Sequence, residues 1–198
     1  MSSKFEILMN QLGISEQLRQ NPALVDARIE RVVVHKISKI WEFHFVFSNI
    51  LPIEIFLELK KGLSEEFSKT GNKAVFEIKA LSQEFSNQLL QSYYREAFSE
   101  GPCASQGFKS LYQNLQVRAE GNQLFIEGSE AIDKEHFKKN HLPNLAKQLE
   151  KFGFPTFNCQ VEKNDVLTQE QEEAFHAENE QIVQAANEEA LRAMEQLE

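Results

Sequence analysis

Two runs of β-branched and aromatic residues, separated by a short polar turn, constrain this chain more than any other feature. The segment from Ile29 to Pro52 reads IERVVVHKISKIWEFHFVFSNILP, and the residues on both sides of Ser38-Lys39 alternate as in half-buried strands. A two-residue turn would place three pairs opposite each other: Ile37 with Ile40, Val34 with Phe43, and Val32 with Phe45. The sequence therefore predicts a β-hairpin of defined register, because a slip of one residue would scatter the apolar side chains over both faces.

Alternation along the strands divides the hairpin into two faces. One face is apolar and is expected to be buried: Val32, Val34, Trp41, Phe43, Phe45 and Phe47. The opposite face mixes apolar, basic, acidic and imidazole side chains: Arg31, Val33, His35, Glu42, His44 and Val46. We expect His35 to lie directly across from Glu42. With Lys79 on a neighbouring strand, this second face is our candidate partner-binding surface. The alternative is that the second half of the chain or the C-terminal segment covers it.

Length and composition are those of a globular protein. The 198 residues are 41% hydrophobic and 10% aromatic, which is enough for one large or two small cores. No apolar run approaches the roughly 20 residues of a membrane span, and the first ten residues lack the pattern of a signal peptide. We therefore expect a cytoplasmic, monomeric protein with no membrane segment.

The net charge of −9 is confined to the C-terminal segment. Residues 164–198 hold ten acidic side chains and one basic side chain, whereas residues 1–163 hold twenty of each. A neutral body does not attract polyanions over long distances, so a DNA-wrapping surface is not indicated. The same segment is rich in Ala, Glu and Gln, which predicts a long acidic helix. We interpret it as a solvated helical linker, with a docking helix as the alternative.

The first half of the chain follows the order α-α-β-β-α-β. Apolar spacing predicts short helices at Phe5–Leu12 and Ser15–Gln20, followed by the hairpin. An amphipathic helix then begins at Pro52 and ends before Gly71, and a strand follows from Lys73.

The second half repeats this order by pattern, without repeating its residues. We expect a helix from Ser82, a second helix over Gly107–Asn114, and a hairpin turning at Gly121-Asn122 that pairs Val117 with Ile126 and Ala119 with Leu124. A helical stretch over 131–151 and a strand over Thr156–Val161 complete the unit. The predicted fold class is therefore α+β, with two small modules at 1–80 and 81–163 and the acidic linker at 164–198.

Residue patterns that carry catalysis are missing from the sequence. It contains no GxGxxG, Walker, GxSxG or HExxH motif. Asp133 and Glu135 form a carboxylate pair like that of an exonuclease metal motif, but they fall at a predicted helix start, where acidic side chains favour the helix dipole. His35, Glu42 and His44 could hold a metal, although surface histidines beside a carboxylate are more often polar contacts. We assign no catalytic residue, no metal and no cofactor.

The order of helices and strands resembles that of type II KH domains, which grip nucleotides with a GxxG loop. No GxxG occurs in this sequence, and Gly101 and Gly107 are too far apart to form one. Weak or no direct nucleic acid binding is therefore expected by that mechanism.

Taken together, these motifs resemble the N-terminal region of the PolC-type DNA polymerase III α subunit, the replicative polymerase of low-GC Gram-positive bacteria. The resemblance covers essentially the whole chain and rests on five motifs in conserved order: the strand Val34-His35-Lys36, the pattern Trp41-x-Phe43-x-Phe45, the helix start Leu51-Pro52, the segment Phe152-Gly-Phe-Pro155, and the charged stretch from Gln169.

The resemblance implies a non-catalytic region of a large enzyme. In that family the two modules precede an oligonucleotide-binding fold, a PHP domain interrupted by a proofreading 3′-5′ exonuclease, and the polymerase core. All catalytic residues lie downstream, so none carries over to this sequence. The first module is similar to the polymerase-binding domain of the clamp-loader τ subunit, and both modules resemble truncated KH folds. The implied role is docking within the replisome, with a partner such as the τ subunit.

A second hypothesis is contact with single-stranded DNA or a primer–template. It is favoured by the KH-like order and by a local group of lysines: Lys36, Lys39, Lys60, Lys61, Lys69, Lys73 and Lys79. Many of these lysines flank glutamates, which is typical of solvated helix faces.

Removal of the acidic segment should leave the rest of the chain folded. Its apolar stripe is thin and its charge density is high, so it is expected to add little to the core. Truncation after Val166 should change the melting temperature by only a few degrees, measured by circular dichroism. A large drop would show that the segment packs on the body.

Overall fold

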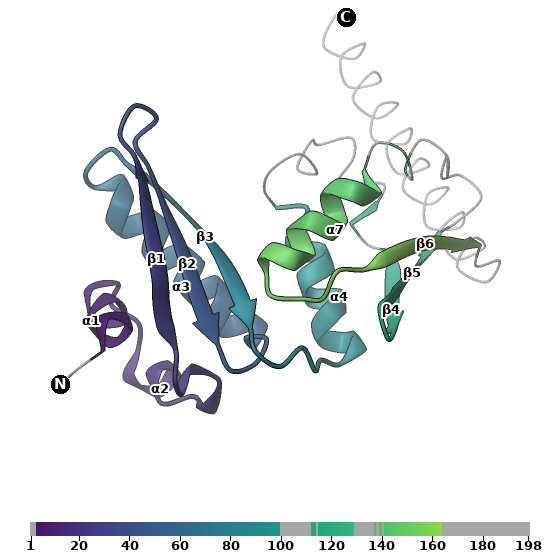
Figure 1. Ribbon diagram of the computed structural model, residues 1–198, viewed down its shortest axis with the longest axis horizontal. Helices are drawn as coiled ribbons and strands as arrows, with labels where there is room; N and C mark the ends of the chain where they lie inside the picture. Colours follow the sequence, from purple (N-terminus) through teal and green to yellow (C-terminus); the bar gives the residue numbers. More distant parts are fainter. Residues whose placement is uncertain are drawn as a thin grey trace, which may run out of the picture.

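The computed structural model describes residues 3–99, 112–113, 115–128, 137, 139 and 141–163, and two small three-stranded sheets organise it (Figure 1). The first half comprises α1 (Lys4–Gln11), α2 (Glu16–Arg19), a 3-10 turn η1 (Pro22–Leu24), β1 (Arg28–His35), β2 (Ile40–Phe47), α3 (Ile53–Ser68) and β3 (Lys73–Ala80). The second half comprises α4 (Asn87–Glu96), β4 (Gln116–Glu120), β5 (Gln123–Gly128), α7 (Leu142–Lys151) and β6 (Asn158–Lys163). The α+β class predicted from the sequence is confirmed.

Helix starts and stops follow local chemistry. Ser3 and Glu6 form a reciprocal capping box at the start of α1, which satisfies two backbone N–H groups that lack partners within the helix. The Ser15 hydroxyl caps α2, and Pro52 precedes the first residue of α3. Gly71 adopts a positive φ of 70° just after α3, a conformation that glycine takes without steric penalty. These helices lie where the sequence places them.

The first hairpin corrects the predicted register. Its turn spans four residues, Lys36–Lys39, so Val34 faces Trp41 and Val32 faces Phe43. The predicted pairs, Ile37 with Ile40, Val34 with Phe43 and Val32 with Phe45, are wrong. The longer turn is made possible by the left-handed φ of 55° at Lys39. The error is a shift of two positions, which preserves the face of every side chain because the pleat also repeats every two residues.

The second sheet has the same topology as the first. In each sheet an antiparallel hairpin is followed by a helix and a third strand that pairs parallel to the second strand of the hairpin. The hairpin at Gly121-Asn122 is confirmed, with Val117 opposite Ile126 and Ala119 opposite Leu124.

The first helix of the second half starts later than predicted. The helix expected from Ser82 begins at Asn87, because the Ser86 hydroxyl accepts a hydrogen bond from the Leu89 backbone N–H and so caps the helix there. The helix expected over Gly107–Asn114, the first part of the stretch 131–151 and the acidic helix over 164–198 lie outside the described residues, apart from isolated positions.

The inner face of the first sheet packs against α1 and α3. The Phe5 ring of α1 makes edge contacts with Phe45 and Phe47, with ring centroids 5.7 and 5.5 Å apart. Figure 1 shows α3 behind the same face of the sheet. Val32 and Val34 share this inner face but are 40% and 42% exposed, because β1 is an edge strand with a neighbour on one side only. Their predicted burial is wrong.

One aromatic cluster joins the two halves of the chain. The Phe56 ring of α3 contacts Tyr93 of α4 at 5.0 Å and Phe152, just after α7, at 4.9 Å between centroids. The Tyr93 hydroxyl donates a hydrogen bond of 3.0 Å to the Leu51 carbonyl, so its one polar atom is satisfied although the side chain is fully buried. Burial raises the pKa of Tyr93. The halves therefore share a continuous core. Within the described residues, no helix is both long and apolar enough to cross a membrane.

Alanine at Gly153 should destabilise the fold more than alanine at Gly71. Gly153 has a positive φ of 99°, and a Cβ there would lie 3.0 Å from Ile78 Cγ2 on β3, whereas a Cβ at Gly71 would meet nothing within 4 Å. Gly71→Ala should cost about 1–2 kcal/mol through its backbone conformation alone. Gly153→Ala should cost roughly a further 1–3 kcal/mol through overpacking. Urea unfolding measures both, and equal losses would show that the two halves do not approach closely at this point.

Candidate protein-binding surface

The uncovered face of the first sheet is the candidate surface. In Figure 1 this face is turned towards the viewer, with α3 on the far side of the strands. Helix α3 packs on the opposite face, where Phe67 contacts Trp41 and Phe56 contacts Phe76. Strand alternation places on it the outward side chains of all three strands, and the parallel register of β2 and β3 brings Lys79 opposite Val46. The structure therefore puts every predicted surface residue on one face: Arg31, Val33, His35, Glu42, His44, Val46 and Lys79.

Exposure separates these residues into three groups. Arg31, His35 and Lys79 are exposed, whereas Val33, Glu42 and His44 are half-buried. Val46 is only 1% exposed and cannot offer contact area to a partner. Its place among the predicted binding residues is therefore corrected.

A row of charged and polar side chains crosses the face from β1 to α7. The Arg31 guanidinium lies 3.2 Å from His44 Nε2, and His44 Nδ1 lies 3.6 Å from the Glu77 carboxylate on β3. Glu77 in turn pairs with Lys151 of α7, with 3.1 Å between Oε1 and Nζ. This row of four side chains connects the first sheet to the second half of the chain.

Glu42 contacts two histidines on the same face. His35 lies opposite Ile40, not opposite Glu42 as predicted, but its Nε2 still reaches Glu42 Oε2 diagonally at 3.2 Å. His44 Nε2 lies 2.8 Å from the other carboxylate oxygen. The hydrogen bond from His35 lowers the pKa of Glu42 below its ordinary value, and the charge of His44 acts in the same direction. The carboxylate is thus held ionised between two imidazoles.

Three side chains of this network, Glu42, His44 and Glu77, lie close enough together to hold a metal ion. Oxygen atoms of Glu42 and Glu77 and a nitrogen of His44 lie within 4.8 Å of one another. The cationic groups of Arg31 and Lys151 already contact this set, so a divalent cation would have to displace them. The arrangement favours an ion-paired surface over a metal centre.

Sequence reasoning missed part of this surface. Val75 and Glu77 share the face because β3 runs parallel to β2, opposite Glu42 and His44 respectively. The alternation from Lys73 to Lys79 was the signal that could have identified them. Nothing in the sequence pointed to Lys151, which reaches the sheet only because α7 packs beside β3.

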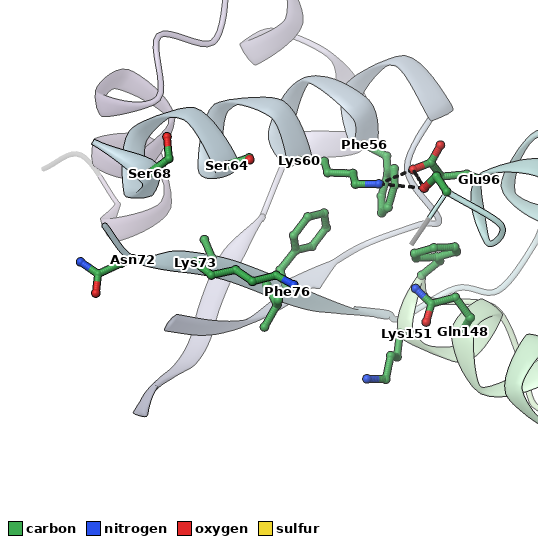
Figure 2. Close-up of a pocket in the computed structure, with 14 residues that line it drawn as sticks. Phe56, Lys60, Ser64, Ser68, Asn72, Lys73, Phe76, Glu96, Gln148 and Lys151 are labelled. Atoms are coloured by element: carbon green, nitrogen blue, oxygen red, sulfur yellow. Dashed lines mark hydrogen bonds and ion pairs between the residues drawn. The ribbon is translucent and has the colours of Figure 1, made fainter. Parts of the chain in front are cut away.

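A groove of about 630 Å³ lies at the open edge of the same sheet. Figure 2 shows it between α3 and β3, with Lys60 of α3 directed at Glu96 of α4. The Lys60 ammonium also donates a 3.0 Å hydrogen bond to the Ser99 hydroxyl. The lining combines aromatic rings with polar and charged side chains: Phe56, Phe76 and Phe152, and Lys60, Lys73, Lys151, Glu96, Ser64 and Ser68.

Comparison with known proteins identifies relatives of this chain. Residues 4–78 match the family model described as DNA polymerase III polC-type N-terminus I, and residues 92–198 match the model of N-terminus II. The chain is 93% identical over 198 residues to the DNA polymerase III PolC-type of Streptococcus pneumoniae strain D39. It is 62% identical over 197 residues to the protein of that name in Streptococcus sanguinis, and 46% identical over 197 residues to that in Streptococcus suis. No solved structure matches the chain.

These matches define the class as the N-terminal region of a bacterial replicative polymerase. The chain belongs to the family of PolC-type DNA polymerase III N-terminal regions. Each of these three relatives is covered over only 14% of its length, while all of this chain is covered. The match is to the N-terminal region alone.

Replacing His35 with alanine should raise the pKa of Glu42 towards its ordinary value of 4.5. A carboxyl whose pKa is lower in the folded than in the unfolded state stabilises the fold above its unfolded pKa, and this stabilisation is lost as the pH falls through the folded pKa. His35→Ala should therefore weaken the dependence of stability on pH in that acidic range. Carbon-13 NMR titration of the Glu42 carboxyl measures the pKa, with Lys79→Ala as the control on the same face. An unchanged Glu42 pKa would remove the His35 hydrogen bond as its cause.

Proposed function

We propose that this chain is a non-catalytic docking region, and that the uncovered face of the first sheet binds another protein of the replisome. The observation that carries the proposal is the cross-strand network on this face. Exposed charged side chains usually lose conformational entropy when a partner immobilises them. Here Arg31, His35 and Glu42 are already held by their neighbours, so a partner would meet a largely ordered surface.

The composition of the face also suits a modest protein interface. Apolar Val33 and Val75 lie beside the charged row, and the exposed Arg31 and Lys79 lie towards the two edges of the sheet. A partly apolar centre with a polar rim is the usual arrangement at protein–protein interfaces.

The family supplies the setting of the proposal. The full-length protein would carry out template-directed DNA synthesis with 3′-5′ exonuclease proofreading in the cytoplasm, and the catalytic residues would lie outside this region. The proposed partner is a replisome protein such as the clamp-loader τ subunit. We further propose two modules at 1–80 and 81–163 that resemble truncated type II KH folds, followed by an acidic helical linker at 164–198. The shared topology of the two sheets supports the modular division.

One observation favours contact with single-stranded DNA as a second function. The turn of the first hairpin presents a fully exposed Ile37 between Lys36 and Lys39. Lys73 lies beside the turn, because its backbone N–H donates a 2.8 Å hydrogen bond to the Lys39 carbonyl. Clustered lysines around an apolar side chain can contact a phosphate backbone and bases.

Charge reversal at Arg31 and Lys79 tests the docking surface. Both side chains are exposed, and neither contacts Glu42 directly. A glutamate at position 35 would instead face the Glu42 carboxylate and be repelled by it. The double variant Arg31→Glu, Lys79→Glu should lose about 1–3 kcal/mol of partner affinity while remaining folded. Binding to purified τ subunit and other replisome proteins is measured by isothermal titration calorimetry.

The matched control reverses the same number of charges away from this face. Lys4 on α1 and Lys61 on α3 are exposed, and Lys4→Glu, Lys61→Glu should leave affinity unchanged. Equal affinity of both double variants for every replisome protein would refute the proposed role of this surface.

Titration with an oligo(dT) strand tests the second function. Binding that weakens with added salt and in the double variant Lys36→Gln, Lys39→Gln would support contact with single-stranded DNA.

A further inference from the structure

The edge of β3 beside the groove exposes main-chain groups. The Lys73 N–H bonds to the Lys39 carbonyl at the start of the strand, and the Leu81 N–H bonds to the Phe47 carbonyl just past its end. In a strand the N–H and C=O of one residue point to the same side, and successive residues alternate. Odd-numbered residues of β3 therefore face β2, and Ala74, Phe76, Ile78 and Ala80 direct their backbone groups to the open edge.

This edge is closed at one end and open at the other. Close to Ala80 the chain after α7 fills the space, because a Cβ at Gly153 would lie 3.5 Å from the Ala80 backbone nitrogen. At Ala74 and Phe76 the groove lies beside the strand instead. Within the described part of the chain, no backbone hydrogen bond from another element reaches these two residues. Two N–H donors and two C=O acceptors thus face the groove.

We propose that the groove binds an extended peptide segment of a partner protein, which adds to β3 as a fourth strand. Strand addition at an exposed edge is a general mode of peptide recognition, in which the main chain supplies affinity and alternate side chains supply specificity. The site is distinct from the uncovered face of the sheet. The proposal does not depend on whether that face binds a partner.

The register of the added strand defines the chemistry of the peptide. Its side chains level with Ala74 and Phe76 would lie on the helix side of the sheet, above the ring of Phe76 and next to Phe56, whose rings are 5.3 Å apart. Its alternate side chains would lie on the side of Lys73 and Lys151. The peptide therefore alternates between apolar and acidic residues.

Charge selects acidic over basic peptides. The Lys73 side chain is exposed and has no ion-pair partner among the described residues, and Lys151 is 51% exposed beside Glu77. An incoming carboxylate near Lys73 gains an attraction that the folded chain does not already use, while a lysine there would be repelled.

Nuclear magnetic resonance with synthetic peptides tests the proposal on the 198-residue chain. The probe is a capped seven-residue peptide that alternates glutamate and valine. Its addition should shift the amide signals of Ala74 and Phe76 and slow their hydrogen exchange at least tenfold at saturation. A peptide with lysine in place of each glutamate should leave these signals unchanged, as should one whose central valine is replaced by proline, because proline lacks the N–H needed in the ladder.

Two variants and one competitor complete the test. Ala74→Pro removes an N–H that points away from β2, so it should abolish peptide binding and leave the sheet paired. Lys73→Gln should weaken binding severalfold without any risk to the fold, and Lys61→Gln on α3 should not change it. The proposal is overturned if the acidic peptide shifts no signals or shifts only those of the uncovered face, if Lys73→Gln binds unchanged, or if oligo(dT) shifts the Ala74 and Phe76 signals and the peptide does not.

Discussion

The contact of Phe56 with Tyr93 and Phe152 is the interaction on which the rest of the structure depends. Each ring comes from a different part of the chain, and together they merge what would be two small cores into one. A small three-stranded sheet with two or three helices buries little apolar surface by itself. A core shared by both halves buries more apolar surface than either half could bury alone. It also fixes α7 beside β3, which brings Lys151 to Glu77 and forms one wall of the groove.

Both proposed binding sites follow from the same asymmetry of the first sheet. Its helices lie on one face and its third strand is an edge, so the sheet retains an uncovered face and a free edge. On the face, side chains are restrained by their cross-strand contacts, and at the edge the backbone itself is the recognition element. The two proposed sites therefore occupy different parts of the sheet, and Lys151 borders both of them.

The electrostatics of the described residues differ from those suggested by the net charge. The acidic excess of the chain belongs to residues 164–198, while the body is neutral and its charges are organised locally. Glu42 is held between His35 and His44, and Glu77 between His44 and Lys151. Specificity on such a surface depends on the position of each charge and not on long-range attraction.

The sequence by itself determined the α+β class, the element order of the first half, the second hairpin and the sharing of one face by Arg31, His35, Glu42 and Lys79, because periodicity and turn residues act locally. It could not give the four-residue turn, since a shift of two positions leaves the alternation unchanged. Tertiary structure alone decided the burial of Val46, the approach of Lys151 to Glu77, and the groove at Ala74 and Phe76. These features depend on the packing of α7 against β3, and contacts between segments so far apart in the chain leave no local pattern.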